Sequence, residues 1–170
     1  MHAIDRGLEH LRRRQGKDGT WMQGLDANPT DQPENTSPVA LATTSMAVQA
    51  FAQRGHELDQ DANMRPAVTA LLSARADDGT IDAGGLSNYV SAAMVSGIAS
   101  LDDDRFRDAI QEGIASLAEH QWDQEEGIGT RADWFGGAGY GSRGRPDLSN
   151  TQAMLQAMHD SGMSPDDPAF

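Results

Sequence analysis

The chain has 170 residues, of which 38% are hydrophobic, and a formal net charge of −13 at pH 7. This length suits one domain with a core of ordinary size, no apolar run reaches the roughly eighteen residues of a membrane span, and the absence of cysteine excludes disulfides, thiolate zinc sites and a thiol nucleophile. The acidic balance also argues against nucleic acid as a partner, because duplex binding requires clustered positive charge.

The first pair of helices is predicted over residues 3–14 and 39–54. A helical pattern that starts at Ala3 leaves no room for a signal peptide, and a cytoplasmic location follows if Met1 is the natural start. Glycines at 16 and 19 end the first helix, and three X-Pro pairs make residues 24–38 a loop. The apolar or small positions on the buried faces are Ala3, Ile4, Gly7, Leu8 and Leu11, and then Val39, Thr43, Met46, Ala47, Ala50 and Phe51.

Two further pairs of helices follow, over residues 62–74 with 87–101, and 104–120 with 148–161. Ser87 or Asn88 is a predicted N-cap. Asp102 to Asp104 are interpreted as helix caps and dipole partners rather than as metal ligands, because they directly precede a helix. The sequence therefore predicts an all-α protein of six helices in three antiparallel hairpins, without a sheet of consequence.

The hairpins are copies of one repeat, with boundaries near residues 3–66, 67–108 and 109–168, all within a single domain 1–170. Each copy opens on an alanine-led apolar pattern at Ala3, Ala67 or Ala109 and then reaches a polar, glycine-containing exit. The exits read Gln15-Gly16-Lys17-Asp18-Gly19-Thr20-Trp21, Arg75-Ala76-Asp77-Asp78-Gly79-Thr80-Ile81 and Gln121-Trp122-Asp123-Gln124-Glu125-Glu126-Gly127. Such units stack, because one unit cannot bury its apolar face alone.

The first copy, with Arg6, Gly7, Leu11, Gln15, Gly19 and Trp21, resembles the QW repeat of squalene-hopene and oxidosqualene cyclases, which share their architecture with protein prenyltransferase β subunits. The second copy departs from the pattern at Arg75 and Ile81, and the third carries Ile128 in place of tryptophan. The segments 136–141 and 145–151 resemble bacterial prenyltransferase/squalene-oxidase repeat proteins. The resemblance implies an α/α toroid, here partial, with first helices outside, second helices inside and a site in the central cavity.

The catalytic motifs of these families are not present. The acidic DxDD motif of cyclases has no counterpart, the zinc site of prenyltransferases needs a cysteine, and the five histidines lack metal-ligand spacing. Catalytic residues are thus unknown, and no metal or cofactor is predicted.

The candidate site is the mouth formed by the first turns of the second helices beneath the long loop 127–147. Aromatic side chains there suit an apolar or sugar ring, arginines suit an anion, and carboxylates suit acid/base work. An alternative is structural, in which Asp147 caps the last helix, Arg145 pairs with it, and the aromatics pack the loop down. The ligand-binding candidates are Asn88, Tyr89, Asp133, Trp134, Tyr140, Arg143, Arg145, Asp147 and Asn150.

Three functions fit these observations. The first is a repeat domain without catalysis that binds a small apolar molecule or a protein partner, and the second is an enzyme, a transferase or cyclase, acting on an isoprenoid or other apolar substrate. An aromatic content of 5% favours the first, since a cyclase cavity stabilises carbocations through aromatic faces. The third is a carbohydrate-active α/α barrel that uses Asp133 with a second carboxylate.

The last repeat carries an expectation about completeness. Met154, Leu155 and Met158 are predicted to need a covering outer helix that does not follow them in the sequence. We therefore expect the chain to be part of a longer toroid or to pair with a second copy.

Overall fold

A computed structural model of the protein describes residues 3–21, 37–76, 79–81, 83–141 and 145–167. These residues form six α-helices and no strand, which confirms the all-α prediction, and every helix lies within a few residues of its predicted bounds. The helices are α1 (Ala3–Arg14), α2 (Pro38–Gln53), α3 (Met64–Ser73), α4 (Ser87–Ala99), α5 (Arg107–Ala118) and α6 (Leu148–Asp160), with short 3-10 helices η2 (Gly84–Leu86) and η3 (Asp104–Phe106).

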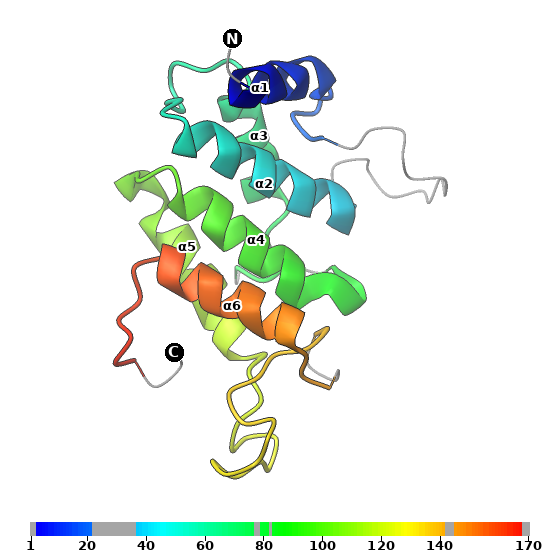
Figure 1. The fold of residues 1–170 in the computed structure, drawn as a ribbon, viewed down its shortest axis with the longest axis vertical. Helices are drawn as coiled ribbons and strands as arrows, with labels where there is room; N and C mark the ends of the chain where they lie inside the picture. The colour runs from blue at the N-terminus through cyan, green and yellow to red at the C-terminus, as the bar shows by residue number, and fades with distance from the viewer. Residues whose placement is uncertain (1–2, 22–36, 77–78, 82, 142–144, 168–170) are drawn as a thin grey trace.

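Three of the helices, α2, α4 and α6, lie side by side (Figure 1), with α4 in contact with both neighbours. Helix α3 packs against α2 and α5 against α4, so the packing continues across the boundaries of the predicted repeats. Gly97 allows the close approach of α4 to α2, because a Cβ atom at this position would lie 2.8 Å from the carbonyl oxygen of Ser45.

The described residues of the first two exits share the same backbone hydrogen bonds. The N–H of Gly16 donates to the carbonyl oxygen of Thr20 at 2.7 Å, and the N–H of Ala76 donates to that of Thr80 at 2.9 Å. The similarity seen in the sequence of these two segments is therefore also a similarity of backbone structure.

Each of these turns requires a glycine. Gly19 and Gly79 have φ angles of +87° and +82°, a region that side-chain-bearing residues avoid. A Cβ atom at Gly19 would lie 2.4 Å from the carbonyl oxygen of Pro66, and one at Gly79 would lie 2.5 Å from the Cβ of Glu112. Both glycines thus allow an exit turn to contact the next helix pair, through α3 for Gly19 and through α5 for Gly79.

In the first repeat, the exit is tied to two helices by side-chain hydrogen bonds. Gln15 donates through Nε2 to the carbonyl oxygens of Gly19 (2.9 Å) and Asn63 (2.8 Å). Trp21 is buried and donates through Nε1 to the carbonyl oxygen of Leu11 at 2.8 Å. These contacts connect the first exit to α1 and to the residue that precedes α3.

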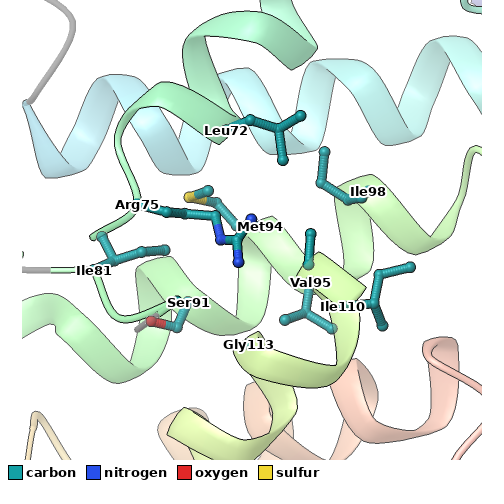
Figure 2. Close-up of a pocket in the computed structure, with 11 residues that line it drawn as sticks. Leu72, Arg75, Ile81, Ser91, Met94, Val95, Ile98, Ile110 and Gly113 are labelled. Carbon is teal, nitrogen blue, oxygen red and sulfur yellow. The ribbon is translucent and has the colours of Figure 1, made fainter. Parts of the chain in front are cut away.

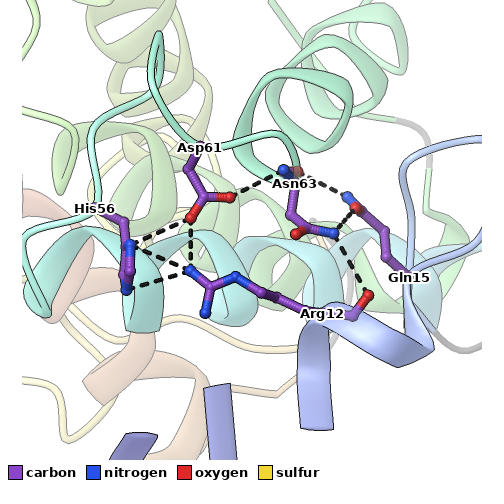
Figure 3. A network of polar contacts seen from close by, with 5 residues as sticks. All are labelled: Arg12, Gln15, His56, Asp61 and Asn63. Carbon is purple, nitrogen blue, oxygen red and sulfur yellow. Dashed lines mark hydrogen bonds and ion pairs between the residues drawn. The ribbon is translucent and has the colours of Figure 1, made fainter. Parts of the chain in front are cut away.

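A polar network holds α1 against the segment between α2 and α3 (Figure 3). Arg12 donates to the Asp61 carboxylate at 2.6 Å, and His56 Nδ1 lies 3.2 Å from the same oxygen. Burial raises the pKa of Asp61, but the hydrogen bonds from Arg12 and the Asn63 N–H, together with the charges of Arg12 and His56, outweigh burial and lower the pKa below its ordinary value of 3.8.

The hydrophobic core has two parts. The larger part is formed by residues of α1, α2, α3 and α4 and includes Phe51, Met64 and Leu71, which are fully buried. The smaller lies between α4, α5 and α6 and includes Met154 and Met158. The prediction that these two methionines need an additional outer helix is wrong, because both are already 0% exposed against residues of α4 and α5; Leu155 is half-buried.

The cap assignments are confirmed in part. The Asp103 carboxylate accepts from the backbone N–H of Arg105 at 3.0 Å and so caps η3, as its interpretation as a cap requires. Ser87 is instead the first residue of α4, and its Oγ donates to the carbonyl oxygen of Gly84. Asn88 forms no cap either, because its side chain is turned into the protein.

Candidate functional site

The long connection between α5 and α6 is closed at its base by backbone hydrogen bonds. Trp122 donates its N–H to the carbonyl oxygen of Gly137 and accepts from the N–H of Gly136, both at 2.8 Å. Gln121 Nε2 donates to the carbonyl oxygen of Gly136 at 3.0 Å. This glutamine is the third-repeat counterpart of Gln15, and here it holds the two ends of residues 122–136 together.

Within this loop, Trp134 is held between two other side chains. Its ring meets Trp122 edge to face, with ring centroids 5.6 Å apart, and the guanidinium carbon of Arg145 lies 5.6 Å from the centroid of the Trp134 ring. Both geometries are attractive for an indole. The Trp134 side chain is nevertheless 41% exposed, so the loop presents an indole whose orientation is already restricted.

Further large apolar side chains are exposed in the same connection and at the start of α6. Tyr140 is 54% exposed and Leu148, the first residue of α6, is 90% exposed. The loop and the start of α6 are joined because Asp147 donates its N–H to the carbonyl oxygen of Ala138 at 3.0 Å. We refer to the exposed set as the aromatic loop surface, which consists of Trp134, Phe135, Tyr140, Arg145 and Leu148.

Beneath this surface, a chain of polar side chains connects α6 with α4. Asp147 accepts from both the backbone N–H (2.9 Å) and the Nδ2 (2.8 Å) of Asn150, and these hydrogen bonds lower the pKa of Asp147. Asn88 Nδ2 in turn donates to Asn150 Oδ1 at 3.3 Å. Asp147 is therefore the N-cap of α6, as the structural alternative predicted.

Both asparagines are 0% exposed, so the prediction that they line an open mouth is not met. A buried polar pair of this kind fixes how two helices are aligned, since neither amide can be shifted without losing its hydrogen bonds. Asn88 Oδ1 has no hydrogen-bond partner among the described residues.

The remaining predicted site residues are distributed as follows. Asp133 is exposed on the loop, Tyr89 is half-buried on α4, and Arg143 lies outside the described residues. Arg145 stacks on Trp134, and it makes no ion pair with Asp147 within the described part of the chain. The structure thus brings Trp134 and Arg145 together and leaves Tyr140 exposed farther along the same connection. Asn88, Asn150 and Asp147 instead join α4 to the start of α6.

Sequence reasoning missed three contributors to this region. Trp122 was assigned only to the exit of the third repeat, and Phe135 was only one aromatic within the long loop 127–147. Leu148 was taken simply as the start of a helix. The available signal for Leu148 was its position directly after the capping Asp147. The first turn of a helix that begins at the surface has little to pack against, so an apolar side chain there is exposed.

Comparison of the chain with protein-family profiles, curated proteins and solved structures gave no match. In the described segments, no helix is both long and apolar enough to cross a membrane. The same segments bring no three side chains of histidine, aspartate or glutamate into a group that could hold a metal ion.

Proposed function

We propose that this chain is an α/α-toroid-like repeat domain that binds a protein partner through the aromatic loop surface. The observation that carries the proposal is Trp134, which is 41% exposed while its ring is held between Trp122 and Arg145. Tryptophan, tyrosine and arginine supply most of the free energy at protein interfaces. A side chain that is already ordered loses less conformational entropy on binding.

The charge of the loop is mixed. The described part of the connection exposes Glu125, Glu126 and Asp133 as well as Arg131 and Arg145. The proposal therefore rests on the ordered, exposed indole and not on charge complementarity.

The proposal is tested by site-specific photo-crosslinking. A photoreactive phenylalanine analogue replaces Phe135 on the loop or, as a control, Met46, which is 48% exposed on α2. A partner that uses the aromatic loop surface forms an adduct from position 135 and not from position 46.

The captured protein is then purified and its affinity measured directly. Trp134→Ala and Tyr140→Ala are expected to weaken binding roughly tenfold or more, as truncation of interface anchors does, whereas Met46→Ala leaves the affinity unchanged. Equal adducts from both positions, or unchanged affinity in both loop variants, would refute the proposal.

A further inference from the structure

A small pocket lies between α3, α4, α5 and the exit turn of the second repeat (Figure 2). Its volume is about 20 Å³. A cavity needs roughly 10–15 Å³ of this kind to hold one water molecule, so the pocket admits one small chemical group. The apolar side chains that line it are Leu72, Ile81, Met94, Val95, Ile98 and Ile110.

The position of the pocket follows from the repeat. Ile81 and Trp21 each come two residues after a positive-φ glycine, in turns with the same hydrogen bonds. In the first repeat the indole of Trp21 is 3% exposed and lies 6.1 Å from the Phe51 ring, centroid to centroid. The second repeat has a smaller side chain at this position, and the pocket lies beside it.

One polar group reaches into this apolar surrounding. Figure 2 shows the guanidinium of Arg75 extending toward Met94 and Ser91. Its Nη2 is paired with the carboxylate of Glu112, but its Nε is buried and has no hydrogen-bond partner in the described part of the chain. A buried N–H without an acceptor is unfavourable.

The chemistry of the lining selects a class of ligand. Glu112 already neutralises the charge of Arg75. The ligand therefore has to supply a hydrogen-bond acceptor for the Nε–H, and this acceptor does not need to be charged. A hydrocarbon would leave the Nε–H unpaired, and a carboxylate would add a second negative charge beside Glu112.

We propose that this pocket binds a small neutral molecule, or the end of a larger one, that has an apolar body and one acceptor oxygen, as in a ketone or an alcohol. The oxygen is the one group that the pocket admits, and it accepts from Arg75 Nε–H. The apolar body extends from it against Ile81, Met94 and Val95. This site is independent of the aromatic loop surface, so each proposal can fail without the other.

The test uses three probes of the same shape, acetone, isobutene and acetate, titrated into the full chain with labelled methyl groups. Acetone is expected to shift the methyl resonances of the pocket side chains Ile81, Met94, Val95 and Ile98 selectively. Isobutene is expected to shift the same resonances only at higher concentration, because it leaves the Arg75 Nε–H unpaired, and acetate is expected not to shift them. Absence of a localised acetone effect, or an equal effect of acetate, overturns the proposal.

Two variants separate the contributions of donor and cavity. Arg75→Met removes the N–H donor and keeps an unbranched apolar side chain, so acetone binding weakens about threefold to tenfold, the value of one hydrogen bond, while isobutene binding is unchanged. Ile81→Trp introduces the residue found at position 21, fills the pocket and abolishes binding of both acetone and isobutene. If the Ile81→Trp variant does not fold, Ile81→Phe is used in its place. Equal loss of acetone and isobutene in Arg75→Met, or binding that survives filling of the pocket, contradicts the assignment.

Discussion

Gln15 donates a hydrogen bond of 2.8 Å to the carbonyl oxygen of Asn63, although 48 residues separate them. Asn63 returns a hydrogen bond from its Nδ2 to the Gln15 side-chain oxygen. One residue just past the end of α1 is thus paired through both of its polar atoms with the residue just before α3. This reciprocal contact connects the end of α1 with the start of α3 and can be tested directly.

Substitution of Gln15 by alanine is expected to lower the free energy of unfolding by about 1–3 kcal/mol, because the partly buried polar groups of Asn63 lose their partners. The measurement is urea denaturation at neutral pH. Arg13→Ala serves as the control, since this side chain is 75% exposed and pairs only with Glu9 on the same helix among the described residues. Equal stability of the two variants would show that the bridge contributes nothing.

The exit turn of the first repeat should not tolerate a side chain at position 19. Gly19→Ala places a Cβ atom 2.4 Å from the Pro66 carbonyl oxygen at a φ of +87°, and we expect a loss of about 1–3 kcal/mol from backbone strain. Gly7→Ala is the matched control. Gly7 lies inside α1 with open space around its Cβ position, so alanine there should stabilise by about 0.5–1 kcal/mol. Thermal midpoints that move in the same direction would contradict the assignment.

Truncation to alanine should lower the free energy of unfolding strongly at Leu117 and hardly at all at Leu148. Leu117 is 0% exposed in the smaller part of the core, and Leu117→Ala is expected to cost about 2–5 kcal/mol. Leu148 is 90% exposed, so Leu148→Ala should change stability by no more than about 0.5 kcal/mol. Calorimetry on both variants decides the matter, and a large loss for Leu148→Ala would mean that this residue is covered in solution.

Stability should fall in acid partly through Asp61. Its pKa is lower in the folded chain than the ordinary 3.8, so the ionised form favours folding. That contribution is complete above the ordinary pKa, and it is lost as the pH falls through the folded-state pKa. Unfolding free energies measured between about pH 5 and pH 2 should therefore depend less steeply on pH in Asp61→Asn than in the wild type. Asp133→Asn, whose carboxylate makes no ion pair within the described residues, controls for the change in net charge; the same slope in all three proteins would exclude this role of Asp61.

Local patterns were sufficient to predict most of the secondary structure. The 3.6-residue spacing of apolar positions, with glycine and proline between the patterns, located all six described helices, and the Asp147 cap followed from a single side chain placed before a helix. These features depend on contacts within a few residues along the chain, which a sequence displays directly.

Contacts between segments distant in sequence were decided only by the tertiary structure. The sequence pattern indicated that Asn88 and Asn150 lie in the first turns of two helices. Whether the two side chains face a mouth or each other depends on the rotation and spacing of α4 against α6, and the structure buries both. The sequence likewise showed isoleucine at position 81, where the first repeat has Trp21. The pocket exists because neighbouring side chains from α3, α4 and α5 do not fill the space that a tryptophan would occupy. Packing of this kind is a property of several helices at once, so it is not contained in the spacing of residues along any one of them.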